Sequence, residues 1–561
     1  MQTDFDAIVI GSGITGGWAA KELCEKGLKV LVLERGREIK HDIDYKGMFQ
    51  PPWKIPFGGK PLRDLYDSEY PVQSKIYAFD ETTRHFFNND KANPYAFNPD
   101  KPFVWIRGGV LGGKSLVWGR HVYRYSDLDF EANKKDGHGC DWPIRYADIK
   151  DWYSYVEKFI GVSGQREGLP QLPDGEFQPP MEMNHVEKVF ANKVRETFGD
   201  SRCVTMGRMA IQTQPQNNRG ACTYCYKCER GCTFKAYFNS IVSTLPAAKA
   251  TGNLTLRCDS VVESIDYDPA TNRASAVRVI DANTRQKLRF TSKMVFLCGS
   301  TIGSTQILLN SKSESFPNGL GNTSGVLGRY LMDHTYGNGA LGVMPGYLDK
   351  YPYGYRPNQI YIPRFKNLRE NDQPYLRGYG YQAAAQRLGW NAKFSMVPGI
   401  GAKFKEAMKG PGPWIMYVAG FGEVLPNHEN HMFLHPTKKD SYGIPLACFD
   451  YVYRENEKAM ITDIVSEAHQ MLAAAGAVMI QDFSGTPPGA SVHEMGTARM
   501  GHNREDSFLN RWNQSHEVPN LFVTDGSCMT SASCVNPSLT LMALTVRAVD
   551  HAVTEYQSGR I

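Results

Sequence analysis

The sequence predicts an α/β fold with a parallel nucleotide-binding sheet and a second region that combines an antiparallel sheet with helices. Residues 5–34 contain two apolar strands separated by a glycine turn and a helix. Residues 293–309 repeat the order of strand, glycine turn and helix, which indicates another strand of the same parallel sheet. Residues 340–450 instead contain short apolar segments between turns, with many tyrosines, a pattern typical of antiparallel strands.

The opening segment has the complete arrangement of a Rossmann-like dinucleotide-binding unit. Its parts are a strand, a glycine turn, a helix, a second strand and an acid, at 5–10, 11–16, 17–26, 28–33 and Glu34. Gly11 permits the tight turn, Gly13 lets the backbone approach a pyrophosphate, and Gly16 lets the helix pack closely on the strand. The helix N-terminus attracts phosphate, and Glu34, followed by Arg35, can bind ribose hydroxyls. An ADP-containing cofactor is predicted, in preference to a purely structural glycine turn.

The composition excludes several classes of protein. With 561 residues the chain exceeds one ordinary core, so two or more domains are expected. A hydrophobic content of 42% and a charged content of 22% are globular values, and a net charge of +5 gives no support for nucleic-acid binding. The first residues lack the basic and apolar parts of a signal peptide, and the absence of any run of about 18 apolar residues predicts no membrane span.

Two segments are candidates for covering and approaching the cofactor. Residues 45–100 are rich in proline and aromatic residues without a period, so we expect an extended surface excursion that either covers the sheet or serves as a cofactor lid. At 107–119, five glycines exclude a helix interior and indicate close backbone approach to a ligand, with a structural loop as the alternative. The residues of this glycine loop that we assign to the cofactor site are Gly108, Gly112, Gly113, Ser115, Val117 and Trp118.

The C-terminal region contains two further motifs. Residues 491–501 include His493 in the run His-Glu-Met-Gly-Thr-Ala-Arg-Met-Gly, and a strand at 520–526 ends in Asp525-Gly526. A helix then runs to about residue 556, with Asn536 predicted as its N-cap and Pro537 as its first residue.

In this order the motifs resemble the glucose–methanol–choline (GMC) family of FAD oxidoreductases from end to end. The resemblance rests on the N-terminal fingerprint, the glycine loop, the turn and helix at 299–309, and the paired motifs around His493 and Asn536. The chain is similar to the bacterial sugar dehydrogenase branch of catalytic subunits, which comprises glucoside 3-dehydrogenase, gluconate 2-dehydrogenase and FAD glucose dehydrogenase. The resemblance implies a GMC fold, bound FAD and hydride abstraction from a sugar carbinol.

Three positions depart from the family pattern. Lys114 stands where the family's glycine loop usually has serine or threonine, and Ser311-Lys312 replaces a common Ser-Gly. Val117 precedes Trp118 at the position where pyranose oxidases carry the histidine that binds flavin covalently. Non-covalent FAD is therefore expected.

The resemblance also implies two interleaved domains. The FAD-binding domain takes residues 1–45, 101–130, 220–330 and 486–561, and includes a cysteine segment at 222–232. The substrate-binding domain, with the segments that cover the cofactor, takes residues 46–100, 131–219 and 331–485.

Alcohol oxidation by a flavin requires a base for the hydroxyl proton, and a base that titrates near neutrality favours histidine. His493 matches the family's catalytic histidine, and Asn536 matches the second position of the pair, where an amide can hold the substrate oxygen but cannot take its proton. From its surroundings alone His493 would be a packed core histidine. Asp525 and Gly526 resemble the family's contact with the ribityl or pyrophosphate region, and the helix end at Asn536-Pro537 would stabilise reduced flavin.

Four of the twelve cysteines, Cys222, Cys225, Cys228 and Cys232, have the spacing C-x2-C-x2-C-x3-C. This spacing matches the ligand run of ferredoxin-type iron–sulfur clusters, whereas zinc sites usually divide into two separated CxxC pairs. Thr233 stands where proline normally follows the last cysteine. Related sugar dehydrogenases carry a three-iron cluster here, so the resemblance favours 3Fe-4S over 4Fe-4S, with zinc as the alternative metal.

A cluster takes electrons singly, which indicates a dehydrogenase that delivers electrons to a redox partner. We therefore predict a sugar dehydrogenase subunit that oxidises a secondary hydroxyl, C3 of a glucoside, and the resemblance implies a small subunit and a multi-haem cytochrome c as partners. Export with the small subunit would place the chain in the periplasm, and a cytoplasmic location is the alternative. Other activities that fit are gluconate or glucose oxidation, a GMC oxidase that uses oxygen, a non-catalytic electron-transfer subunit, and a zinc-stabilised binding protein.

Overall fold

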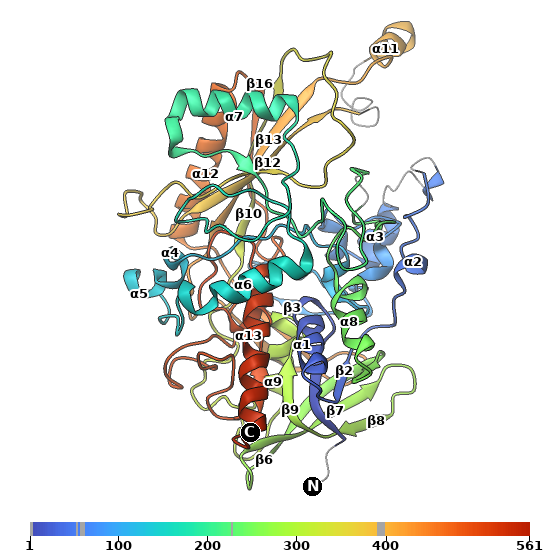
Figure 1. Ribbon diagram of the computed structural model, residues 1–561, viewed down its shortest axis with the longest axis vertical. Coiled ribbons are helices and arrows are strands. Elements are labelled where there is room, and N and C mark those ends of the chain that lie inside the picture. The colour runs from blue at the N-terminus through green and yellow to red at the C-terminus, as the bar shows by residue number, and fades with distance from the viewer. Residues whose placement is uncertain (1–3, 52–53, 57–61, 226–227, 390–398) are drawn as a thin grey trace.

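The structure, a computed structural model, describes residues 4–51, 54–56, 62–225, 228–389 and 399–561. Two main sheets lie at opposite ends of the molecule, and the first described strand and the C-terminus lie at the end that holds the parallel sheet (Figure 1). Parts of the predicted excursion, residues 52–53 and 57–61, lie outside the described residues.

The parallel sheet has five strands in the order β17-β9-β1-β2-β5. Its strands are β1 (Phe5–Ile10), β2 (Val30–Leu33), β5 (Leu254–Arg257), β9 (Ser292–Leu297) and β17 (Leu521–Val523). Every pairing within it is parallel, and β2 is buried throughout, as expected of a strand with both faces covered. The predicted parallel sheet, including the strand near residue 293, is confirmed.

The antiparallel sheet has six strands in the order β16-β10-β13-β12-β11-β4 and confirms the prediction for 340–450. Its strands are β4 (Thr205–Met206), β10 (His334–Met344), β11 (Ile360–Ile362), β12 (Tyr379–Arg387), β13 (Trp414–Glu423) and β16 (Val478–Phe483). The helix α12 (Glu455–Ala474) packs along β10 and β13. Tyr361, Tyr379 and Tyr381 are buried in this region, so they are packing residues.

Two three-stranded sheets complete the strand inventory of the described ranges. One consists of β3 (Ala96–Phe97), β14 (His431–Lys439) and β15 (Pro445–Asp450), and the other of β6 (Ser260–Asp268), β7 (Arg273–Asp281) and β8 (Lys287–Phe290). The remaining helices are α1 (Ile14–Glu25), α2 (His41–Asp44), α3 (Arg63–Glu69), α4 (Asp127–Phe130), α5 (Ala132–Asp136), α6 (Tyr146–Ile160), α7 (His185–Phe198), α8 (Thr244–Ala250), α9 (Thr301–Asn310), α11 (Gly401–Ala407) and α13 (Ser538–Gln557). Among the described helices, none has both the length and the apolar character that a membrane span requires.

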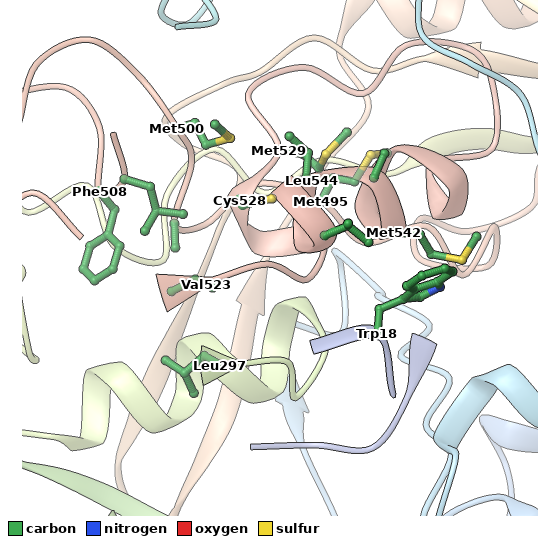
Figure 2. Packing of buried hydrophobic residues seen from close by; sticks show 14 of the residues in the cluster. Trp18, Leu297, Met495, Met500, Phe508, Val523, Cys528, Met529, Met542 and Leu544 are labelled. Carbon is green, nitrogen blue, oxygen red and sulfur yellow. The ribbon is translucent and has the colours of Figure 1, made fainter. Parts of the chain in front are cut away.

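The largest apolar cluster joins the parallel sheet to α13 (Figure 2). It includes Leu297 and Val523 from neighbouring strands and Met542 and Leu544 from α13, all with no measurable exposure. Helix α13 also packs against α1 and α6. Burial of such side chains contributes about 1.5–3 kcal/mol each, which fixes the position of the α13 N-terminus.

The structure corrects the predicted boundaries of two helices. Helix α1 begins at Ile14, before the predicted start at residue 17, and so places Gly16 in its first turn. The prediction that Asn536 caps α13 is wrong, as is that of Pro537 as the first helical residue. Pro537 occupies the N-cap position without a side-chain hydrogen bond, because the amide of Asn536 bonds to Gln382 and His493 instead of turning back onto the helix.

The excursion at 45–100 is more than a surface coil. It contains α3, and it buries the side chains of Tyr45, Tyr66, Phe86 and Phe87 in the apolar cluster beside β1 and β2. The parallel strands all come from ranges predicted for the FAD-binding domain, and the six antiparallel strands come from ranges predicted for the substrate-binding domain. The domain boundaries themselves remain a prediction.

Candidate active site

A cavity of about 1240 Å³ lies between the two main sheets. Ile10 and Leu33, the last residues of β1 and β2, line it on one side, and Gln382 and Phe421 of the antiparallel sheet line it on the other. Ligands of parallel α/β sheets bind outside the carboxyl ends of the strands, which is where this cavity begins. Its volume exceeds the roughly 300–1,000 Å³ of ordinary small-molecule pockets, so it has room for a dinucleotide and a substrate.

The first glycine turn forms the end of the cavity at the parallel sheet. Gly11 has φ +99°, and a Cβ atom there would lie 2.4 Å from the carbonyl oxygen of Cys298. A Cβ at Gly16 would lie 2.0 Å from the carbonyl oxygen of Gly11, so Gly16 packs the helix and does not line the cavity. At Gly13, which does line the cavity, a Cβ would meet nothing within 4 Å. The tight turn at Gly11 and the close packing at Gly16 are therefore present in the fold, and the approach of Gly13 to a pyrophosphate stays a prediction.

Glu34 lies at the end of β2, buried beside this turn. Its carboxylate accepts hydrogen bonds from the backbone N–H groups of Gly36 at 2.8 Å and Ser12 at 3.2 Å, and from the Ser12 hydroxyl. Burial raises the pKa of Glu34 above its ordinary value, and these hydrogen bonds offset only part of that rise. Arg35, also in the cavity wall, donates to the side chain of Asn93 at 3.2 Å.

The second glycine loop lies against the first. Gly108, Gly113, Ser115, Val117 and Trp118 line the cavity, and their contact with a cofactor stays a prediction. Gly112 does not line it, and its backbone N–H donates to the hydroxyl of Ser12 at 2.9 Å, which ties the two loops together. Part of the loop, Gly113–Leu116, forms a short 3-10 helix.

The walls between the loops and α13 fit a flavin dinucleotide. The open space beside Gly13 admits a pyrophosphate, and the N-terminus of α1 adjoins it. Glu494 lines the cavity with one carboxylate oxygen, Oε1, buried and without a hydrogen-bond partner. Asp525, Gly526 and Pro537, which are predicted to contact the flavin, line the same wall. Asp525 is held in place by Ser304, whose hydroxyl donates to it at 2.5 Å.

Lys114, which departs from the family pattern, lines the cavity beside the segment that carries His493. Its Nζ lies 2.7 Å from Oε2 of Glu494, the residue that follows His493. Its positive charge is one of the causes that lower the pKa of His493. The lysine therefore acts on the electrostatics of the site, a role that a serine or threonine could not have.

His493 and Asn536 come together at the opposite wall of the cavity. Nδ2 of Asn536 lies 3.4 Å from Nε2 of His493, although 43 residues separate them in the chain. Burial is the largest cause that lowers the pKa of His493 well below its ordinary value. The expectation of a base that titrates near neutrality is corrected, because His493 is a neutral imidazole at neutral pH and is ready to accept a proton.

Two side chains that the sequence did not single out contact this pair. Nδ1 of His334, the first residue of β10, lies 2.8 Å from Nδ1 of His493. Nε2 of Gln382, on β12, donates to Oδ1 of Asn536 at 2.9 Å. Both are far from their partners in the chain and belong to strands with no sequence motif, so only the fold brings them to the site.

Asp333 fixes the loop that carries His493. Its buried carboxylate accepts hydrogen bonds from the backbone N–H of Gly489 at 2.7 Å, from the backbone N–H of His493 at 3.3 Å, and from the hydroxyl of Ser491. Burial raises the pKa of Asp333 to about 6.

The four clustered cysteines line one small cavity, which Ile211 and Tyr237 also line. Burial raises the pKa of the Cys222 thiol to about 11, and raises that of Cys228 well above its usual range. Within the described residues, which omit 226–227, no three histidine, cysteine or acidic side chains take up an arrangement that holds a metal ion. The thiols share a site without the ligand geometry of a cluster, and the iron–sulfur assignment stays a prediction.

Comparison with known proteins places these features in a wider group. The N-terminal part of the GMC oxidoreductase family matches residues 5–336, and its C-terminal part matches residues 426–545. The 2-methyl-1,2-propanediol dehydrogenase of Mycolicibacterium austroafricanum is 29% identical over 97% of this chain and 94% of its own length. The fructose dehydrogenase large subunit of Gluconobacter japonicus is 25% identical over 99% and 98%.

One further protein is similar to this chain in sequence over a short region, and another is similar in its fold. The C-glycoside 3-oxidase of Arthrobacter globiformis is 31% identical over 132 residues, which are 23% of this chain and 25% of that protein. The formate oxidase of Aspergillus oryzae RIB40 superposes with a TM-score of 0.62 over 99% of both chains at 13% identity. This agreement confirms the GMC fold that the sequence predicts.

Proposed function

The chain belongs to the GMC oxidoreductases, which use FAD to oxidise alcohol groups, and from this premise we propose that it is a sugar dehydrogenase subunit. It oxidises a secondary carbinol, C3 of a glucoside, to the ketone. The observation that carries the proposal is the pairing of a neutral His493 with the amide of Asn536 inside a cavity that also holds the nucleotide-binding loops.

The pair supplies what the alcohol oxygen needs. A hydroxyl placed between the two side chains donates its proton to Nε2 of His493 and accepts a hydrogen bond from Nδ2 of Asn536. Bound FAD would supply the acceptor for the hydride of the carbinol carbon. The O–H bond breaks as the new N–H bond forms, and the carbon is left as a carbonyl. Because burial keeps the imidazole neutral, the base needs no deprotonation before it acts.

A sugar is the substrate class that fits this cavity and these relatives. The wall opposite the glycine loops carries the polar side chains of Gln359 and Tyr417, which suits a molecule with several hydroxyls. The relatives named for fructose and C-glycoside oxidation also support a sugar. Gluconate or glucose remains the alternative substrate, and oxygen the alternative acceptor.

We assign the electron exit to the segment that carries Cys222, Cys225, Cys228 and Cys232. These thiols line one cavity, and their spacing is that of ferredoxin-type ligands. An iron–sulfur cluster, 3Fe-4S in our assignment, would accept electrons singly at that position. The relative named a large subunit supports an assembly with partner chains, for which we propose a small subunit and a multi-haem cytochrome c in the periplasm.

The test of the activity is an absorption spectrum of the purified protein before and after addition of a glucoside without oxygen. A flavin spectrum that bleaches with the glucoside, and less with gluconate or glucose, is expected. Acid precipitation should leave yellow FAD in the supernatant, since Val117 offers no group for covalent attachment. A flavin that no sugar reduces would overturn the proposed substrate class and favour a non-catalytic electron-transfer subunit.

The cluster has its own test. Elemental analysis should find iron and acid-labile sulfide, and Cys225→Ser should remove both and slow electron transfer to an acceptor more than it slows flavin bleaching. Cys258→Ser, at a partly buried cysteine outside the run, is the matched control and should change neither. If the protein contains zinc and no iron, the cluster assignment is wrong. If it contains iron but loss of the iron in Cys225→Ser does not slow electron transfer to the acceptor, the assigned electron exit is wrong.

A further inference from the structure

His334 is completely buried, and the hydrogen-bond partners of its two ring nitrogens determine which nitrogen carries a hydrogen. Its Nε2 lies 2.9 Å from the carbonyl oxygen of Ser533 and 3.3 Å from that of Ala532. A carbonyl oxygen only accepts hydrogen bonds, so Nε2 of His334 must carry a hydrogen. The hydroxyl of Tyr453 donates to the backbone carbonyl of His334 at 3.0 Å and helps to hold the residue in place.

Only one hydrogen is present on this ring at neutral pH. Burial lowers the pKa of His334 to about 4, so the ring is neutral and its Nδ1 has a lone pair. This Nδ1 lies 2.8 Å from Nδ1 of His493, and a hydrogen bond there requires His493 to donate. Since His493 is also neutral, its single hydrogen sits on Nδ1, and Nε2 is left with a lone pair.

We propose that His334 is a positioning residue that fixes the tautomer of His493, so that Nε2, the nitrogen that faces Asn536 in the cavity, is the one that accepts a proton. The proposal rests on the proposed function, because it explains how the base of that reaction is prepared. His334 does not touch the substrate. It acts by accepting the hydrogen bond that the opposite tautomer could not donate.

A second chain of hydrogen bonds, on the other side of the ring, agrees with this tautomer. Nε2 of Gln382 donates to Oδ1 of Asn536 at 2.9 Å, so the Asn536 amide turns its Nδ2 donor towards His493. Nδ2 then lies 3.4 Å from Nε2 of His493, where it meets a lone pair. With a hydrogen on that nitrogen, two donors would face each other. The backbone N–H of His493 donates to Asp333 at 3.3 Å, which fixes the backbone that carries the ring, and the contacts with His334 and Asn536 hold the ring itself.

The tautomer can be measured without any substrate. In the holoenzyme labelled with ¹⁵N-histidine, Nε2 of His493 should resonate as an unprotonated nitrogen and Nδ1 as a protonated one, with the signals assigned from a His493→Gln variant. In His334→Ala the two signals should move towards each other as both tautomers become populated. His85→Ala is the matched control, because it also removes a partly buried ring that contacts a carbonyl oxygen, that of Asp44 at 2.7 Å, and it should leave His493 unchanged.

A protonated Nε2 in the wild type, or an unchanged tautomer in His334→Ala, would overturn the proposal. A double-mutant cycle on flavin reduction gives a second readout. Loss of the tautomer should slow reduction by roughly 10–10³-fold in His334→Ala, with little change in KM. In a His493→Ala background the same change should cost less than about 2-fold, because a residue that acts through His493 has nothing left to position.

Equal slowing in both backgrounds would instead show a general structural role for His334 and overturn the inference. His334→Asn keeps the protein testable if the alanine variant fails to fold, since its carbonyl oxygen can stand in place of Nδ1 and should restore part of the rate. If no sugar reduces the wild-type flavin, the proposed function fails, while the nitrogen signals still decide the tautomer.

Discussion

The two main sheets contribute to the cavity in different ways. At the parallel sheet the backbone builds the site, because Gly11 and Gly13 leave no side chain between the strand ends and a ligand. At the antiparallel sheet side chains build it, because His334 and Gln382 hold the ring of His493 and the amide of Asn536. At the parallel sheet, adding a side chain at a glycine would obstruct the ligand. At the antiparallel sheet, removing a side chain would release the groups that it holds in place.

The difference separates binding from chemistry. Changes at the glycine turns should release the cofactor, and changes at the antiparallel sheet should leave the cofactor in place and slow its reduction. Flavin content and the rate of flavin reduction are therefore the two measurements that test this separation of binding from chemistry.

The largest effect is expected for His493→Ala. Loss of a positioned base should slow anaerobic flavin bleaching by about 10²–10⁴-fold, while flavin content and sugar affinity stay close to those of the wild type. Because burial lowers the pKa of His493 well below 6.5, the wild-type rate should be flat above that pH and fall only in more acidic solution. Stopped-flow bleaching across pH measures both.

His431→Ala is the control for the removal of a ring, since the His431 ring bonds to the carbonyl oxygen of Glu429 at 2.8 Å and His431 does not line the cavity. A His493→Ala variant that keeps the wild-type rate would return His493 to the role of a packed core histidine.

The part of the site that the backbone forms at the parallel sheet is predicted better from the sequence than the part that side chains form at the antiparallel sheet. Glycines and the acid at the end of β2 follow a fixed order because a tight turn and a close phosphate approach demand them, so the parallel sheet and its loops were predicted. His493 and Asn536 were found through the family motif. His334 and Gln382 lie 159 and 154 residues from their partners, and nothing local in β10 or β12 distinguishes them from packing residues.

Two predictions at the same site failed for a related reason. Asn536 has the residue type and position of an N-cap, and His493 the ordinary pKa of a neutral-pH base. In the folded chain, Gln382 turns the amide away from the helix, and burial changes the pKa of the ring. Both outcomes depend on tertiary contacts that the local sequence does not contain.

The next largest effect is expected for a change in the glycine turn that follows β1. In Gly11→Ala the new Cβ would lie 2.4 Å from the carbonyl oxygen of Cys298, and φ is +99°, so the turn should distort and the protein should be purified with little FAD. Overpacking against backbone costs about 1–3 kcal/mol beyond the cost of the positive φ. Flavin absorbance per protein and the thermal unfolding midpoint measure the change.

Gly27→Ala is the matched control. Gly27 has φ +85°, but a Cβ there meets nothing within 4 Å, so only the conformational cost applies and FAD should be retained. Equal losses of FAD in both variants would show that the positive φ angle, and not the close approach of the Cys298 carbonyl oxygen, is what requires glycine at residue 11.

Asp333 and His334 give a smaller effect, on stability as a function of pH. Burial raises the pKa of Asp333 from 3.8 to about 6, which makes folding less favourable as pH rises through that range. Burial lowers the pKa of His334 from 6.5 to about 4, which makes folding less favourable as pH falls through nearly the same range. The two effects oppose each other, so the wild-type free energy of unfolding should vary little on their account between pH 4 and 6.

Asp333→Asn should remove that balance. The variant should lose roughly 3 kcal/mol more than the wild type between pH 6 and 4, because about two pH units of uncompensated proton binding remain at His334. Urea unfolding at both pH values measures the difference. A variant that is less stable by the same amount at every pH would show that Asp333 acts only as a hydrogen-bond acceptor.

The smallest effect is expected for Gln382→Leu, which removes the donor that orients the Asn536 amide at 2.9 Å. The amide can then turn its oxygen towards His493, and the substrate oxygen loses a hydrogen bond for part of the time. A neutral hydrogen bond contributes about 0.5–1.5 kcal/mol, so flavin reduction should slow by roughly 2–12-fold with flavin content unchanged.

Gln481→Leu makes the same substitution on the exposed strand β16 and should leave the rate unaltered. Combined with Asn536→Ala, Gln382→Leu should add nothing further, because its only route to the reaction is the amide that has been removed. An additive loss in that double variant would mean that Gln382 contacts the substrate itself. The antiparallel sheet would then supply a binding group directly, in addition to holding the groups that react.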